Sequence, residues 1–236
     1  MIKIVSYNIR GGLGMDGIRD IHRIGTYLKT LDADLICLQE VHKCLPQSGN
    51  IDQPLCLAEQ LRMTCTFSST LSIGEGKYGI ATFSRLPVLS ATHLRLPNIR
   101  ERLKGIVWRE RRTAVAVEVL VDGRSISVWN THWSLNAKDR LCSAERLATA
   151  LPSNKVVLVG DFNAGEGSGE IARLMELTGL QDAGVAEKIC TFPSDEPRHR
   201  IDRFFHSPEL NVIGMHVPDS PLSDHLPVIA GVNCFM

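Results

Sequence analysis

The sequence predicts an α/β fold with mixed β-sheets, which combine parallel and antiparallel strands. In the first third of its 236 residues, apolar strand segments alternate with a segment of helical period. Residues 78–94 and 113–131 instead have the pattern of antiparallel hairpins. Parallel strands need a crossover, often helical, whereas hairpins give antiparallel pairs, so both patterns together indicate mixed sheets. No linker, charge block or fixed-period repeat divides the chain, which predicts a single domain over residues 1–236.

Five segments expected as strands each carry polar side chains at one end. Residues 3–8 end on Asn8, 34–40 on Glu40, 125–132 on Asn130 and His132, and 156–161 on Asp161, while Asp224 and His225 directly precede the last apolar segment. A strand that is apolar along its body buries that body and exposes its tip. Five such tips at one sheet edge would form a polar pocket.

The stretch VVLVGDFNA, residues 156–164, carries the most chemical information. Its apolar, largely β-branched start predicts a buried strand, and Gly160 is expected to let the backbone turn sharply. Because Phe162 alone separates Asp161 from Asn163, carboxylate and amide would share one face. The alternative is an Asx turn, in which such side chains only satisfy the backbone.

Four segments have the apolar periodicity of amphipathic helices. They are residues 18–31, 55–63, 140–151 and 171–177. The last one stops just before Gly179, a residue typical of helix C-termini.

The bulk properties exclude several classes of protein. A formal net charge of zero disfavours a sequence-independent nucleic-acid binder. The seven cysteines are odd in number and lack zinc-finger spacing, which predicts reduced core thiols and a cytoplasmic location. Neither a signal peptide nor a transmembrane helix is expected, and we expect a monomer.

One segment departs from the overall balance of basic and acidic residues. Residues 95–112 contain seven basic and two acidic side chains. The simplest interpretation is a solvated loop. However, the loop leads into a strand that pairs, through an Asp122-Gly123 turn, with the strand carrying His132. The alternative is therefore that it lies beside the chemistry and contacts a nucleic acid.

Six short motifs occur in a family-specific order: YNIR, LQEV, NTHW, GDFN, RID and SDH. Together they resemble the endonuclease/exonuclease/phosphatase superfamily over residues 3–228. The resemblance implies a four-layer sandwich, in which two mixed β-sheets pack face to face with helices outside. It also implies an active site at one edge of the sandwich.

Asn8, Glu40 and Asp224 form an all-oxygen set at strand tips, which suits Mg²⁺. The resemblance assigns Glu40 as the main carboxylate ligand, with Asn8 and Asp224 assisting directly or through water. Mn²⁺ is expected to substitute for Mg²⁺. The alternative for an isolated glutamate after a strand is an exposed side chain without a ligand role.

The resemblance also implies the catalytic residues. His225 would face the scissile phosphate and be oriented by Asp202, and His132 would be a second catalytic imidazole. Asp161 would position or deprotonate the attacking water, and Asn163 would orient that water or bind a phosphate oxygen. Either Asp161 or His225 could accept the proton of the water; we favour Asp161.

Tyr78 and Arg112 are candidate substrate contacts by the same resemblance. Tyr78 would touch phosphate or pair with the position of His132, with a core tyrosine as the alternative, and Arg112 would clamp phosphate. Phe192 and Trp108 are candidates to line the substrate cleft, although core packing is favoured for Phe192.

The expected reaction is metal-dependent, in-line hydrolysis of a phosphate ester by water. We favour a small or lipid-like phosphoester, because the charge is balanced and only residues 42–54 and 95–112 leave room for specificity loops. The alternative is a DNA or RNA nuclease that uses loop 95–112. A catalytically inactive binding module is disfavoured, since every motif keeps its chemically required residue.

Overall fold

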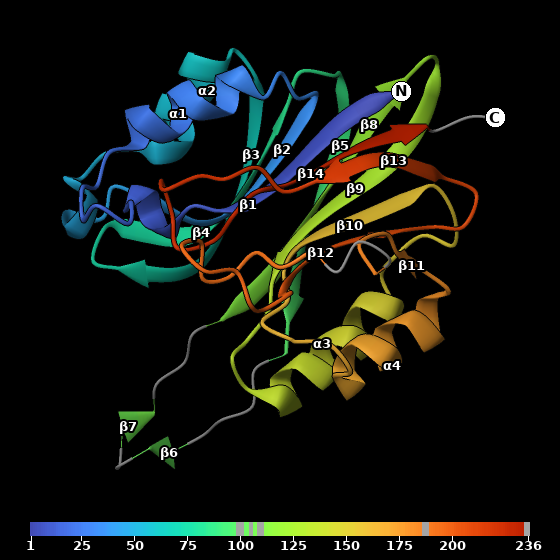
Figure 1. Ribbon diagram of the computed structural model, residues 1–236. Helices are drawn as coiled ribbons and strands as arrows, with labels where there is room; N and C mark the ends of the chain where they lie inside the picture. Colours follow the sequence, from blue (N-terminus) through green and yellow to red (C-terminus); the bar gives the residue numbers. More distant parts are fainter. Residues whose placement is uncertain (98–101, 104–105, 108–110, 186–188, 234–236) are drawn as a thin grey trace.

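The computed structural model describes residues 1–97, 102–103, 106–107, 111–185 and 189–233 (Figure 1). Its first sheet has the order β13-β14-β1-β2-β4-β3, with bounds Asn211–His216, Val228–Asn233, Ile2–Asn8, Leu35–Lys43, Gly76–Ser84 and Thr64–Ile73. Its second has the order β11-β12-β10-β9-β8-β5, with bounds Gln181–Asp182, Asp202–His206, Val156–Asp161, Arg124–His132, Arg112–Val121 and Val88–Leu96. Strands β6 (Arg102–Leu103) and β7 (Ile106–Val107) form a separate ladder.

Four α-helices complete the layers. They are α1 (Ile21–Thr30), α2 (Gln53–Leu61), α3 (Ala137–Ala148) and α4 (Gly169–Thr178), and short 3-10 turns lie at Arg10–Gly12 and Pro46–Ser48. Helices α1 and α2 cover the first sheet, and α3 and α4 cover the second, so that the sheets face each other between two helical layers (Figure 1). The four-layer sandwich implied by the family resemblance is confirmed.

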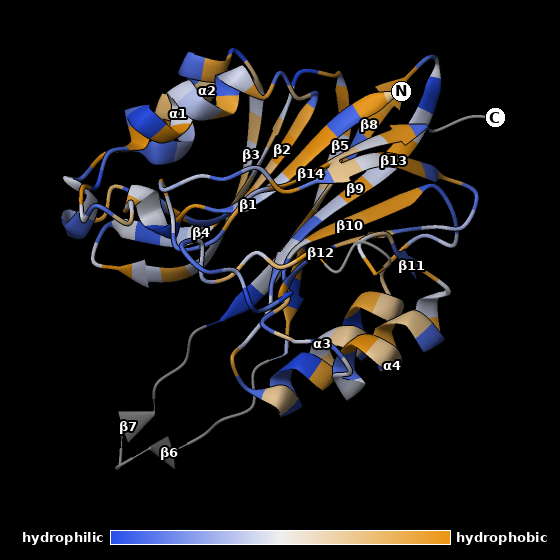
Figure 2. Cartoon of the chain, in the orientation of Figure 1, coloured by the Kyte–Doolittle hydropathy of each residue, from blue (hydrophilic) through white to orange (hydrophobic). Residues whose placement is uncertain are grey.

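The apolar residues divide into three packed layers. Side chains such as Ile4, Val128 and Phe204 fill the space between the sheets. Leu28 of α1 and Leu147 of α3 belong to the clusters beneath the two helical layers. Figure 2 shows hydrophobic colour along the central strands and both colours on the helices, as expected for amphipathic helices on buried sheets.

Each sheet contains one parallel pair joined by a helical crossover. Strands β1 and β2 are parallel and connected through α1, and β9 and β10 are parallel and connected through α3. The other ladders in the described residues are antiparallel. Mixed sheets are therefore confirmed.

The hairpin expected over residues 113–131 is confirmed, but the one expected over 78–94 is wrong. Strands β8 and β9 join through Asp122 (φ 48°) and Gly123 (φ 76°), which have the positive φ of a type I′ turn. In contrast, β4 pairs with β3 in the first sheet, whereas β5 pairs with β8 in the second. Two alternating strands in succession thus belong to different sheets.

The helix expected over residues 18–31 begins later, at Ile21. Asp20 caps it by accepting a hydrogen bond from the His22 N–H (2.8 Å), and Ile18 before the cap is 55% exposed. The other three helices lie where periodicity placed them, within a few residues. No helix in the described part of the chain is long and apolar enough to cross a membrane.

Two further expectations concern cysteines and the basic loop. The six cysteines in the described residues are free. Cys37 is buried in the core, and Cys56 and Cys65 are partly buried against it, so core thiols are confirmed for these three and not for the others; Cys234 lies outside the described residues. Most of loop 95–112, including Trp108, also lies outside the described residues. Its nucleic-acid role therefore stays a prediction.

The topology brings the polar strand tips to one edge. The carboxyl ends of the parallel strands β1, β2, β9 and β10 lie at this edge. Strand β12 runs antiparallel to β10, which places Asp202 opposite Asp161. Strand β14 runs antiparallel to β1, with Val228 opposite Ser6, so the segment just before it reaches the same edge.

Candidate active site

A β-bulge determines the direction of Glu40. Leu38 pairs with Ala81 and Val41 pairs with Gly79, so β2 contains one more residue than β4 at this point. Glu40 lies in the bulge with φ 58°, in the left-handed region that non-glycine residues seldom adopt. Bulges commonly re-aim a side chain beside an active site, and here the Glu40 carboxylate lies within reach of Asn8 of β1.

Asn130 supports this bulge from the opposite sheet. Its Nδ2 donates to the Leu38 and Ala81 carbonyls (3.1 and 3.0 Å), and its Oδ1 accepts from Gln39 Nε2 (2.8 Å). The side chain is fully buried. Asn130 therefore links the two sheets and is not one of the exposed tips expected from sequence.

Asp161 combines the two alternatives considered for the GDFN stretch. Its Oδ1 accepts from the Asn163 N–H (2.9 Å), which is the Asx turn. Its Oδ2 accepts from Asn8 Nδ2 (3.0 Å) and lies 3.4 Å from His132 Nε2 and 3.8 Å from His225 Nε2. One oxygen thus shapes the turn, and the other is the centre of the candidate site.

The turn itself is built differently from the expectation. Asn163 has φ 49°, and its Nδ2 donates to the Trp133 carbonyl (3.0 Å). Gly160 lies within β10 with φ 145°, where a Cβ atom would be 1.9 Å from the Thr131 carbonyl oxygen. Glycine is therefore required by close approach to β9 rather than by a sharp turn.

His225 and Asp202 form a buried pair. His225 Nδ1 lies 2.8 Å from Asp202 Oδ2, and the Thr191 hydroxyl donates to the same oxygen. Burial alone would lower the pKa of His225, but the carboxylates of Asp202 and Asp161 outweigh it and raise this pKa to about 10. His225 is consequently an imidazolium at neutral pH.

The pKa values of the other two central groups, His132 and Asp161, shift in opposite directions. Burial and then the Arg112 charge lower the pKa of His132 well below its usual value, so this imidazole is neutral. Burial and then Asp202 raise the pKa of Asp161, which moves this carboxyl toward the range of a base at neutral pH. The site therefore holds a cationic imidazole, a neutral imidazole and a carboxylate of raised basicity.

Carboxylates accumulate on the Glu40 side of the site. Asn8 Nδ2 also donates to Glu40 Oε1 (3.2 Å), so one amide bridges Glu40 and Asp161, while Asn8 Oδ1 accepts from the Arg10 N–H (3.1 Å). Burial raises the pKa of Glu40, the Asn8 donor opposes this, and the Asp224 charge adds to it. Asp224 forms an ion pair with Arg10 (3.4 Å).

The donor chemistry fits a divalent cation. Glu40 and Asp224 are half-buried carboxylates whose charges disfavour each other, and they offer hard oxygen ligands. The amide oxygen of Asn8 faces Arg10 in this arrangement, so its ligand role stays a prediction. Asp161, Asp202 and His225 offer a second set, with ligand atoms all within 4.8 Å of one another. Since His225 Nδ1 already hydrogen-bonds Asp202, we assign that set to proton chemistry.

The two candidate substrate contacts lie on the strands flanking this centre. Arg112 begins β8, is 5% exposed, and its charge acts on both Glu40 and His132. Tyr78 is half-buried on β4 opposite His42, with ring centroids 5.7 Å apart. The contact of either residue with phosphate stays a prediction.

Sequence reasoning missed several residues that shape the site. Thr191 carries no motif signal, and it is found only through its contact with Asp202. For Phe192, the sequence favours core packing over a place in the substrate cleft. The residue is half-buried with its ring centroid 4.8 Å from that of His225, so the favoured core position is wrong. Arg10 belongs to the YNIR motif, and its charge could have suggested a partner for Asp224.

A buried ion network holds the loop that follows Asn163. Arg203 donates to the Ala164 and Gly165 carbonyls (3.1 and 2.8 Å) and pairs with Asp182 (2.8 Å). Arg200 also pairs with Asp182, and all three charged side chains are at most 3% exposed. The network fixes the backbone on the far side of the Asp161 turn.

Comparisons with known proteins agree with this architecture. The model of the endonuclease/exonuclease/phosphatase family matches residues 5–225. A structure of such a protein from Beutenbergia cavernae is 24% identical with a TM-score of 0.80, and the match covers 98% of this chain and 71% of that one. A mannosyl-6-phosphatase from Bacteroides thetaiotaomicron is 18% identical, with a TM-score of 0.72 and coverage of 99% and 100%. The human Nocturnin catalytic domain with bound sulfate is 20% identical, with a TM-score of 0.74 and coverage of 98% and 94%. A comparison with curated proteins gives no match.

Proposed function

We propose that this chain, which belongs to the endonuclease/exonuclease/phosphatase family of phosphoester hydrolases, hydrolyses a small or lipid-like phosphoester with Mg²⁺ as its cofactor. The observation that carries the proposal is the position of Asp161 Oδ2, between Asn8 on one side and the imidazoles of His132 and His225 on the other. This arrangement offers a base, a cation and a neutral donor around one point. A phosphate ester and an attacking water need these groups together.

The proposed roles follow from the charges. Asp161, whose pKa is raised, accepts a proton as the water oxygen bonds to phosphorus and the bond from phosphorus to the leaving oxygen breaks. His225 keeps its proton at Nε2, because Nδ1 is held by Asp202, and donates to a phosphoryl oxygen as negative charge develops. Neutral His132 offers a further hydrogen bond, and Asn163 orients the water or an oxygen of the phosphate.

Glu40 would be the main ligand of the metal, assisted by Asn8 and Asp224. When bound, Mg²⁺ supplies Lewis-acid stabilisation of the charge that develops on phosphate oxygens. Burial and the Asp224 charge raise the pKa of Glu40, and a cation held by these carboxylates would act against both effects. Mn²⁺ would substitute, since it accepts the same oxygen ligands.

Two considerations favour a small substrate over a nucleic acid. The chain has no net charge to attract a polyanion over long distance. One structural neighbour is named as a mannosyl-6-phosphatase, whose name indicates a sugar phosphate. Against this, loop 95–112 is basic, and nuclease activity is the alternative that it favours.

The test is hydrolysis of bis-p-nitrophenyl phosphate and of a panel of phosphomonoesters, with and without Mg²⁺. We expect turnover that chelator abolishes and that Glu40→Gln lowers at subsaturating metal. Glu59→Gln is the matched control, because it makes the same change on the exposed face of α2.

Full activity in chelator would refute the role of the metal. Efficient cleavage of plasmid or single-stranded DNA at near-physiological salt, without turnover of small esters, would refute the choice of substrate.

A further inference from the structure

A polar cavity lies beside the candidate active site. It has a volume of about 530 Å³ and lies between the β3–β4 hairpin and the strands β5 and β8. Its described lining consists of hydroxyl and basic side chains with one leucine, and it includes no carboxylate. The lining residues are Ser69, Thr70, Leu71, Ser72, Lys77, Arg95, Arg111, Arg112 and Thr113.

Three of these cations have no acidic partner among the described residues. Within the described part of the chain, Lys77, Arg95 and Arg111 make no ion pair and no side-chain hydrogen bond. These three side chains are exposed, and other exposed arginines of the chain are paired, as Arg85 is with Asp32. A group of like charges around a concavity repels itself, so it indicates a site for an anion.

The cavity adjoins the catalytic centre through β8. Thr113 lines the cavity and lies opposite His132 in the β8–β9 ladder. The hydroxyls of Ser68 and Thr113 (3.2 Å) join the β3 wall to the β8 wall. Arg112 also lines the cavity, and its charge acts on Glu40 and His132. An anion in the cavity would therefore lie one strand away from the catalytic groups.

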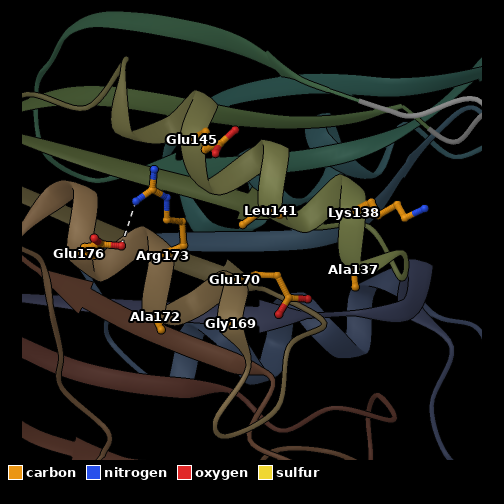
Figure 3. Close-up of a pocket in the computed structure, with 9 residues that line it drawn as sticks. All are labelled: Ala137, Lys138, Leu141, Glu145, Gly169, Glu170, Ala172, Arg173 and Glu176. Carbon is orange, nitrogen blue, oxygen red and sulfur yellow. Dashed lines mark hydrogen bonds and ion pairs between the residues drawn. The ribbon is translucent and has the colours of Figure 1, made fainter.

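A larger concavity lies between α3 and α4 (Figure 3), but it contains carboxylates and lies away from the catalytic groups. Its volume is about 760 Å³, but Arg173 on its wall pairs with Glu176, and Glu170 pairs with Arg140. None of the groups converging on Asp161 lines it. Its lining carries three carboxylates and two cations, whereas the charged residues in the described lining of the cavity beside β8 are all cations.

We infer that the cavity between the β3–β4 hairpin and β8 binds a second phosphate group of the substrate, next to the phosphate that is hydrolysed. The inference rests on the proposed function for the position of the scissile phosphate. It narrows the substrate class to phosphoesters that carry another phosphate. That group could belong to a small bisphosphate or to the next nucleotide of a strand.

The test compares ligands that differ only in the second phosphate. Calorimetry measures binding of propyl phosphate and of alkanediol bisphosphates with three to six carbons, at near-physiological salt. We expect at least one bisphosphate to bind roughly tenfold more tightly than propyl phosphate, as two partly exposed ion pairs would give. The double variant Lys77→Gln/Arg111→Gln should lose this gain. Lys29→Gln/Arg62→Gln is the control, with the same loss of charge on and beside the helices of the first sheet.

The outcomes separate this inference from the proposed function. If no bisphosphate binds more tightly than propyl phosphate, or if the gain survives Lys77→Gln/Arg111→Gln, the second phosphate site is refuted even when bis-p-nitrophenyl phosphate is hydrolysed. If the gain depends on these cations but no ester is hydrolysed, the site stands and the proposed function fails. Tighter binding of a five-nucleotide single strand than of any bisphosphate, lost in the same variant, supports the site and identifies a strand as the source.

Discussion

Replacing Asp202 by asparagine tests whether Asp202 and His225 act as one unit. The substitution keeps the size of the side chain and an oxygen that can accept from His225 Nδ1 and from the Thr191 hydroxyl. It removes the negative charge that holds His225 as an imidazolium. Because Asp202 Oδ1 is buried without a hydrogen-bond partner among the described residues, the change breaks no further contact there.

The expected loss follows from the 2.8 Å contact. A hydrogen bond to a charged group contributes about 1.5–3 kcal/mol, which corresponds to roughly 10–150-fold in rate. Asparagine still accepts the Nδ1 proton, so we expect kcat to fall toward the lower limit, by roughly tenfold, with little change in KM. His225→Ala removes the donor to the phosphate itself and should lower kcat by at least about 10²-fold.

The assay is steady-state hydrolysis of the best small ester by the two single variants and by the double variant. If Asp202 acts through His225, the double variant should be no slower than His225→Ala. A double variant whose loss equals the product of the single losses would refute the pairing. Urea denaturation of each variant shows whether a lower rate reflects unfolding instead.

Three further predictions concern stability. Asp182→Asn leaves two buried arginines without their shared anionic partner, so the free energy of unfolding, measured by urea denaturation, should fall by about 3–5 kcal/mol. The control Glu176→Gln disrupts an exposed ion pair and should lower it by less than about 1 kcal/mol. Asn130→Ala removes three hydrogen bonds at the bulge and should cost about 2–4 kcal/mol in the same assay; a cost near zero would contradict its linking role. Burial raises the pKa of the Cys37 thiol to about 12, so above the unfolded thiol pKa the native state binds more protons and stability falls as pH rises. Wild type should therefore lose up to about 1.4 kcal/mol per pH unit more than Cys37→Ala between pH 9 and 11, and equal slopes would rule this out.

The polar strand tips could be predicted because their physical cause is local. An apolar strand body followed by a polar residue shows which end emerges from the core, and parallel strands bring like ends together. The pattern accordingly predicts Glu40 and Asp161 without any knowledge of the sheet topology. Asp202 is predicted through the family resemblance, which pairs it with His225, and not through a local pattern of its own strand.

Features that depend on pairing between distant strands could not be predicted. The alternation of β5 is the same whether it pairs with β4 or with β8, since the pattern reports burial and not the neighbour. The bulge at Glu40 adds one residue that no composition signals, and it becomes visible only through the register with β4. Asn130 was misassigned for the same reason, because its partners belong to the other sheet.

The positive φ of Glu40 lowers the stability of the fold at a residue that the proposed metal site requires. Glycine would occupy this left-handed position without the steric cost of about 1–2 kcal/mol that a side chain adds, and it would bury no carboxylate. Selection for thermostability alone would therefore favour losing the proposed metal ligand at this position. Folding alone therefore does not account for a glutamate in this conformation, whereas the proposed metal site does.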